Sequence, residues 1–244
     1  MRTVLAAVYV FLKTVTSYPT RLYNKIKYKD QKLGYDLNYK KLNKMTSRML
    51  KILGIEVKLE GNCDLEDRSF LYVGNHRSDF DSLILIAYTK RPIVFIGKSE
   101  IKKMPFIGKW FTDIGCIFID REDAKASMAA IVEGIKRLKN GYSLVIFPEG
   151  GRTREEGIRE FKPGSMKLAT KSGVDIVPIT FYNTEECYER YHKLKPAKVK
   201  MAIGEPINLE KEGLKSTTEI ARYVQCLIDN NYKKMAGIDT NENH

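Results

Sequence analysis

The sequence predicts an α/β fold, with a mixed, largely parallel sheet covered by helices and, ahead of it, a basic arm of two membrane-associating helices. Two observations predict the sheet. Short apolar runs of strand length alternate with segments of helical periodicity, as in chains whose strands are joined by crossover helices. Most of these runs are apolar nearly throughout, which is typical of strands buried on both faces. The arm is predicted by the excess of positive charge at the N-terminal end of the chain.

The arm should form two helices before the sheet begins. We expect one helix to about Tyr28, interrupted near Pro19 because proline lacks an N–H donor, and a second over about 36–53. The chain then divides into an N-terminal part of basic amphipathic membrane-associating helices, 1–54, and a catalytic domain, 55–244.

The strands follow as apolar runs separated by polar or turn-forming residues. We expect them near residues 55–60, 69–74, 92–96, 116–119, 143–147, 175–181 and 198–203. The accompanying helices should lie at about 79–88, 106–113, 123–139, 163–172 and 216–235. The clearest helical pattern places Met128, Ile131, Ile135 and Leu138 on one face.

Charge distinguishes the arm from the rest of the chain. Residues 1–58 hold 13 Lys or Arg and three acids, so they carry +10 of the total +12. Such a patch indicates binding to nucleic acid or to an anionic membrane. The apolar run from Val4 to Leu12 and the tyrosines among the lysines after it favour the membrane. A basic nucleic-acid-binding protein remains the remote alternative.

The apolar run near the N-terminus is too short to span a bilayer. Val4 to Leu12 is nine residues, whereas a spanning helix needs about 20. We therefore expect peripheral, monotopic association with the cytoplasmic face of a membrane. A signal peptide is the competing interpretation, because Arg2 precedes the run, but no small-x-small cleavage site follows it cleanly.

The cysteines predict neither a disulfide framework nor a metal site. Cys63, Cys116, Cys187 and Cys226 are scattered without metal-ligand spacing, so reduced structural thiols are the default expectation. The chain also has no nucleotide-binding glycine fingerprint. We expect neither a metal nor a cofactor.

One polar segment indicates catalysis. Residues 75–81 read Asn-His-Arg-Ser-Asp-Phe-Asp, with His76 five positions before Asp81. A neutral imidazole can take a proton from a hydroxyl near pH 7, and a carboxylate on its other nitrogen fixes the tautomer. The pair follows an apolar strand and precedes a helix, where open α/β sheets place active sites. Alone the pattern is weak, because such pairs are common by chance and aspartates often cap helices.

Three further blocks make this pattern specific. One apolar run ends in Asp120 and Arg121, and a second ends in a glycine-rich turn that carries Arg152. A third, 174–180, contains a proline. In this order and spacing, the four blocks resemble the glycerolipid acyltransferase family, specifically the 1-acyl-sn-glycerol-3-phosphate (lysophosphatidate) acyltransferases, over roughly residues 55–205.

The resemblance implies a role for each matching residue. His76 becomes the general base and Asp81 its support, with Asp79 at the start of the helix. The implied binding site for the acceptor's glycerol phosphate consists of Lys98, Arg121, Glu149, Gly150 and Arg152. Gly151 departs from the family pattern, which usually has Thr or Ser there, so a hydroxyl contact from that position is missing.

The chemistry of these residues agrees with the implied roles. Arginine grips phosphate oxygens bidentately, and glycine lets backbone N–H groups approach closely. For Arg121 or Arg152 alone, a surface ion pair with a nearby acid would be the commoner explanation.

The function implied is transfer of a fatty acyl group from acyl-CoA or acyl carrier protein to the 2-hydroxyl of 1-acyl-glycerol 3-phosphate. The product would be phosphatidic acid, made in phospholipid synthesis. Glycerol 3-phosphate or another lysophospholipid as acceptor stays open, as does a lipid hydrolase that uses the same base on water.

Overall fold

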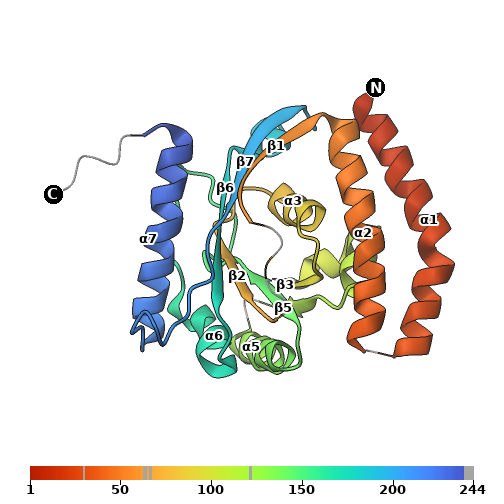
Figure 1. Cartoon of the computed structure of the whole chain (residues 1–244). Helices are drawn as coiled ribbons and strands as arrows, with labels where there is room; N and C mark the ends of the chain where they lie inside the picture. Colours follow the sequence, from red (N-terminus) through yellow and green to blue (C-terminus); the bar gives the residue numbers. More distant parts are fainter. Residues whose placement is uncertain (30, 63–64, 66–67, 121–122, 239–244) are drawn as a thin grey trace.

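The computed structural model (Figure 1) describes residues 1–29, 31–62, 65, 68–120 and 123–238. Its seven strands form one sheet. The strands are β1 (Ile55–Gly61), β2 (Leu71–Gly74), β3 (Ile93–Lys98), β4 (Ile117–Ile119), β5 (Ser143–Ile146), β6 (Ile176–Tyr182) and β7 (Ala197–Ile203). Each lies within a few residues of a predicted strand, because the apolar runs that suggested the strands are also the residues that the sheet buries.

The order of the strands places five carboxyl ends at one edge. The sheet runs β1-β7-β6-β2-β5-β3-β4, and every neighbouring pair is parallel except β6 and β7. Strands β6, β2, β5, β3 and β4 therefore share one direction, whereas β7 and β1 run the other way. The prediction of a mixed, largely parallel sheet is confirmed. In such sheets, ligands bind outside the carboxyl ends of the strands.

Seven α-helices and three short 3₁₀ helices complete the described fold. They are α1 (Arg2–Tyr28), α2 (Lys32–Leu53), α3 (Phe80–Tyr88), η1 (Ser99–Lys103), α4 (Ile107–Asp113), α5 (Ala124–Lys139), η2 (Pro163–Met166), α6 (Lys167–Ser172), η3 (Thr184–Cys187) and α7 (Thr217–Ala236).

Two expectations for the arm are wrong in detail. The helix was expected to be interrupted near Pro19, but α1 continues through that proline; its long contact with α2 compensates for the missing N–H donor. α2 begins at Lys32, four residues before the predicted start. There Lys32 Nζ lies 2.8 Å from Asp36 Oδ2, an ion pair one turn apart that supports the added turn.

Helices cover both faces of the sheet. Side chains alternate along each strand, so on β2 Tyr72 enters one hydrophobic cluster while Leu71 and Val73 enter the other. The Tyr72 cluster also contains residues of α1 to α4, and the second contains residues of α5, α6 and α7. Figure 1 shows α7, α6 and α5 on one side of the sheet and α1, α2 and α3 on the other.

The arm is joined to the sheet domain by buried polar contacts. Arg21 of α1 is 1% exposed, and its Nη1 donates to Asp113 Oδ2 at 2.5 Å. Its guanidinium carbon lies 3.9 Å from the centroid of the Trp110 ring, and Trp110 Nε1 donates to Thr14 Oγ1 at 2.9 Å. On α2, Asn43 Nδ2 donates to the Ile86 carbonyl at 2.6 Å, near the end of α3. The division of the chain at residue 54 stays a prediction, and α2 belongs to the same core as the sheet.

α1 exposes apolar as well as charged side chains, and it buries several polar ones. Val8 and Leu12 are 50% and 52% exposed, whereas Thr14, Arg21 and Asn24 are buried. In the described part of the chain, no helix combines the length and the apolar character needed to cross a membrane.

Cys116, Cys187 and Cys226 are free thiols, and burial raises the pKa of Cys116 and of Cys187 to about 12. Cys63 lies outside the described residues.

Candidate active site

The site forms where β2, β5 and β6 end beside one another. Asn75 follows β2, and its side-chain amide donates to the Phe181 carbonyl at 2.9 Å and accepts from the Phe181 N–H at 2.8 Å. The side chain thus takes the place of a backbone partner for β6, while the main chain turns away from the sheet. This turn brings His76 over the sheet edge and leads into α3.

His76 and Asp81 are hydrogen-bonded to each other. His76 Nδ1 lies 2.9 Å from Asp81 Oδ2. Asp81 is fully buried, and its Oδ2 also accepts the N–H groups of Arg77 and Ser78 at 2.7 and 2.8 Å. The Thr184 hydroxyl donates to Oδ1 at 2.5 Å. Asp81 thus accepts hydrogen bonds on both oxygens, and its contact with Nδ1 leaves Nε2 as the His76 nitrogen that can face a substrate.

The imidazole is fixed in place but reachable. Its ring stacks on Phe147 with centroids 4.3 Å apart and planes 11° apart. The His76 side chain is 14% exposed, so part of it can meet a substrate.

Glu149 supports the backbone of the histidine loop. It is 5% exposed, and its Oε1 accepts the His76 N–H at 2.6 Å. Its Oε2 accepts from the Thr153 hydroxyl and from the Arg159 N–H. The Thr153 N–H in turn donates to the His76 carbonyl at 2.8 Å. Burial raises the pKa of Glu149, although these three hydrogen bonds act in the opposite direction.

Arg152 lies beside the loop and is paired with two carboxylates. Its Nη1 lies 2.7 Å from Asp79 Oδ2 and 3.1 Å from Glu189 Oε1. Glu189 also binds the loop directly, accepting the Asp79 N–H at 2.9 Å on Oε1 and the Ser78 hydroxyl at 2.6 Å on Oε2. Asp79 stands at the N-cap of α3, as expected, but its carboxylate bonds Arg152 and makes no capping hydrogen bond.

The other predicted site residues occupy the same edge, apart from one that lies outside the described residues. Lys98 ends β3, and its Nζ lies 2.7 Å from Glu100 Oε1. Gly150 has φ +75°, a backbone conformation that favours glycine, whereas the nearest atom to an added Cβ would be the flexible end of Lys162. Arg121 is the predicted residue outside the described part of the chain.

Several residues that complete the site were not identified from the sequence patterns. Thr184, Thr153 and Glu189 hold the catalytic loop, and Phe147 orients the base. Arg77, 6% exposed, pairs with Glu185 and donates to two backbone carbonyls, so it ties the loop to two neighbouring segments. Phe147 and Thr153 lie on either side of residues 149–152, so their nearness to the predicted site residues in the sequence could have identified them. Thr184 and Glu189 lie more than a hundred residues after His76, and no local pattern marks them.

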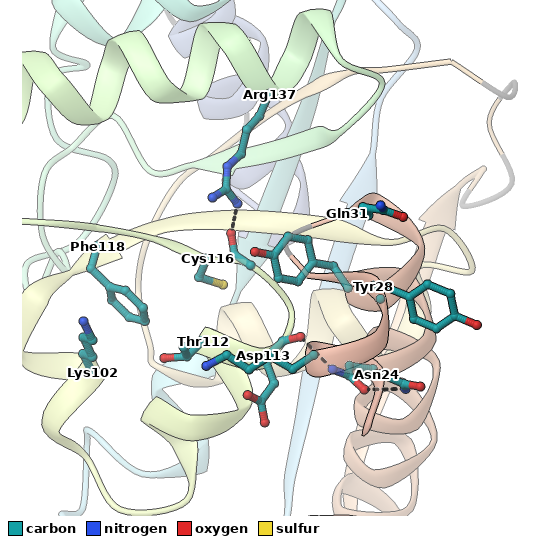
Figure 2. Close-up of a pocket in the computed structure, with 14 residues that line it drawn as sticks. Asn24, Tyr28, Gln31, Lys102, Thr112, Asp113, Cys116, Phe118 and Arg137 are labelled. Carbon is teal, nitrogen blue, oxygen red and sulfur yellow. Dashed lines mark hydrogen bonds between the residues drawn. The ribbon is translucent and has the colours of Figure 1, made fainter. Parts of the chain in front are cut away.

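A cavity lies away from this site. It has a volume of about 220 Å³ and lies between the α1–α2 turn, α4 and β4 (Figure 2). Asn24, Lys102, Asp113, Cys116 and Arg137 are among its lining residues, and none of the predicted site residues contributes to it. It therefore belongs to the junction with the arm. Across the described ranges, no group of three His, Cys, Asp or Glu side chains is arranged to hold a metal.

Comparison with known proteins gives consistent matches. The family model described as Acyltransferase matches residues 56–182. A 1-acyl-sn-glycerol-3-phosphate acyltransferase of Borreliella burgdorferi is 36% identical over 57% of this chain and 56% of its own length. A probable 1-acyl-sn-glycerol-3-phosphate acyltransferase of Mycoplasma pneumoniae is 32% identical over 71% of this chain and 67% of its own. The crystal structure of the 1-acyl-sn-glycerophosphate (LPA) acyltransferase PlsC from Thermotoga maritima has a TM-score of 0.77 and 26% identity, covering 97% of this chain and 98% of that one. The matched range 56–182 contains every predicted site residue.

Proposed function

This chain belongs to the acyltransferase family and groups with its 1-acyl-sn-glycerol-3-phosphate acyltransferases, and from this premise we propose that it acylates the 2-hydroxyl of lysophosphatidate. The acyl donor is a thioester, acyl-CoA or acyl carrier protein, and the product is phosphatidic acid. The observation that carries the proposal is the pairing of His76 with buried Asp81, next to an arginine at the same sheet edge.

The acceptor's phosphate would bind Arg152. A guanidinium suits phosphate oxygens because it offers planar, paired N–H donors. Arg152 is 37% exposed, so a ligand can reach it, and it lies in the loop whose Thr153 N–H bonds the His76 carbonyl. We assign Lys98 and Arg121 to the same phosphate, each as an additional cation. Gly150 leaves room for the ligand near the backbone.

We assign Glu149 a supporting role in place of direct acceptor binding. Its two oxygens already accept three hydrogen bonds within the protein, from His76, Thr153 and Arg159. These bonds fix the peptide that carries the base.

Acyl transfer would proceed without a covalent acyl-enzyme. His76 Nε2 removes the proton of the acceptor's 2-hydroxyl as that oxygen attacks the thioester carbonyl carbon, and Asp81 stabilises the imidazolium. The carbonyl electron pair moves onto oxygen and gives a tetrahedral oxyanion. On collapse, the C–S bond breaks and the thiolate leaves, taking up the proton held by His76. The ester of the 2-hydroxyl remains on the acceptor.

The arm would hold the protein on an anionic membrane surface, where acceptor and product reside. Support comes from the apolar outer face of α1 together with its net positive charge. Met104 and Phe106 extend this face beyond α1, since Phe106 is 41% exposed and its ring lies 5.8 Å from that of Phe11. We place this contact at the cytoplasmic face.

The test is product identification with purified protein. Lysophosphatidate and lysophosphatidylcholine are supplied in vesicles and glycerol 3-phosphate in solution, each with acyl-CoA or acylated carrier protein. The products are identified by mass spectrometry. The proposal expects phosphatidic acid from lysophosphatidate with at least one donor. Preference for another acceptor would replace the assigned substrate, and release of free fatty acid without acceptor acylation would identify a hydrolase.

A further inference from the structure

The acceptor-free site already contains negative charge at the place proposed for the phosphate. Arg152 Nη1 contacts Asp79 at 2.7 Å and Glu189 at 3.1 Å. A phosphate that binds Arg152 must either share the arginine with both carboxylates or displace one of them. The two carboxylates differ in ways that decide which one can leave.

Asp79 is the carboxylate that can leave. Its side chain is 65% exposed, and within the described residues its carboxylate pairs with Arg152 through Oδ2. Rotation of the side chain would move the carboxylate into water at small cost, because exposed ion pairs are weak. Its place in α3 does not depend on that contact, since the Asp79 side chain makes no capping hydrogen bond.

Glu189 is the carboxylate that stays. It is 19% exposed and uses both oxygens, one for the Asp79 N–H and Arg152 and the other for the Ser78 hydroxyl. Ser78 is fully buried, and its own N–H bonds the catalytic Asp81. Displacing Glu189 would therefore break contacts within the loop that carries the base.

We propose that Asp79 is a counter-ion that occupies the acceptor-phosphate position on Arg152 until the acceptor binds. Glu189 is then the positioning residue, because it holds Arg152 at a fixed place relative to the His76 loop. This inference rests on the proposed function and adds two residues to it. Asp79 sets how tightly the acceptor binds, because the phosphate must replace it. Glu189 sets where the phosphate is held relative to the base.

The two residues predict effects of opposite sign. Asp79→Asn should lower the Michaelis constant for lysophosphatidate by up to about fivefold, because an exposed ion pair that competes with the phosphate is removed. The constant for the thioester should not change. Glu189→Gln should raise the constant for lysophosphatidate and lower kcat, because an amide cannot accept from Arg152, Asp79 and Ser78 together. Glu189→Asp should restore part of the loss.

Two controls separate this inference from a general charge effect. Glu156→Gln removes one exposed acid from the neighbouring loop and should leave both constants unchanged. Acylation of 1-acylglycerol, which lacks the phosphate, should gain nothing from Asp79→Asn.

Direct binding distinguishes failure of this inference from failure of the proposed function. Titration calorimetry of a short-chain lysophosphatidate into His76→Ala protein needs no turnover, and adding Asp79→Asn should tighten that binding. If wild-type protein makes phosphatidic acid but Asp79→Asn leaves both KM and binding unchanged, the counter-ion role is wrong and the proposed function stands. If Glu189→Gln raises both substrate constants equally, Glu189 is only structural.

Discussion

The carboxyl edge of the sheet buries polar side chains, whereas the outer face of α1 exposes apolar ones. At the edge, Asn75, Ser78 and Asp81 are completely buried, and each makes hydrogen bonds that hold the catalytic loop. On α1, apolar side chains such as Val8 and Leu12 face outward. A buried polar group must find hydrogen-bond partners, whereas a large contiguous exposed apolar patch marks a site of contact with a protein or a membrane.

The two regions therefore suit different kinds of contact. The edge holds polar atoms at fixed positions, which suits the proposed acyl transfer. The exposed apolar side chains of α1 provide contact area without fixed polar positions, which suits the proposed binding to a fluid lipid surface. The junction of the arm with the sheet domain, where Arg21 contacts Asp113 and Trp110, is a third kind of region. Among the described residues, Arg21 Nε is the buried side-chain polar atom that has no hydrogen-bond partner. The junction is therefore less well satisfied than the catalytic loop.

Removing the base should have the largest effect. His76→Ala should lower kcat about a hundredfold to ten-thousandfold while the far-ultraviolet circular dichroism and vesicle binding stay unchanged. His192→Ala is the matched control, because His192 is an exposed histidine outside the four sequence blocks, and it should retain activity. Comparable loss in both variants would show that the edge is not the catalytic region.

Breaking the junction should cost stability. Arg21→Met leaves Asp113, 14% exposed, without its partner, and should lower the free energy of unfolding by about 3 kcal/mol. Urea denaturation measures this. Asp113→Leu added to Arg21→Met should recover much of the loss, since both charges are then absent. Equal stability of wild type and Arg21→Met would mean that α1 is not fixed to the sheet domain through this pair.

Removing the proposed phosphate ligand should act on one substrate only. Arg152→Ala should raise the Michaelis constant for lysophosphatidate about tenfold to a hundredfold, because a charge-assisted hydrogen bond contributes about 1.5–3 kcal/mol. The constant for the thioester should stay within about twofold. Arg154→Ala, at an exposed position two residues away, should change neither. An equal effect on both substrates would move Arg152 to the donor or to a structural role.

Changing the outer face of α1 should weaken membrane binding without touching chemistry. Val8, Leu12 and Val15 are about half exposed and share one face of the helix. Replacing all three with Gln should reduce binding to anionic vesicles about tenfold in sedimentation, while turnover of a short-chain soluble acceptor is kept. Met128→Gln with Val132→Gln, a comparable change on the exposed face of α5, is the control. Unchanged vesicle binding would remove α1 as the membrane contact.

The sequence predicted the sheet well because its central strands, such as β2 and β5, are short apolar runs that the sheet buries. It also brought His76 and Asp81 to one junction, since both lie in one local motif. It did not predict the partners of that motif. Thr184 and Glu189 meet the loop only because β6 ends beside β2. The sequence pattern also predicted a helix break at Pro19, whereas α1 continues through this residue. The prediction used only the missing backbone N–H of proline and did not take into account the packing of α1 on α2.

The stacking of His76 on Phe147 bears on the handedness of the substrate. One face of the imidazole is closed by the phenyl ring, whose centroid lies 4.3 Å away. Asp81 fixes the plane of the ring, so an acceptor can lie only on the side that Phe147 leaves open. Under the proposed function, the acceptor has two attachment points, its 2-hydroxyl at Nε2 and its phosphate at Arg152, and the closed face of the ring adds a third, steric constraint. Three constraints are what a protein needs to tell a molecule from its mirror image, so the phenylalanine that follows β5 would favour one enantiomer of the acceptor by excluding the other.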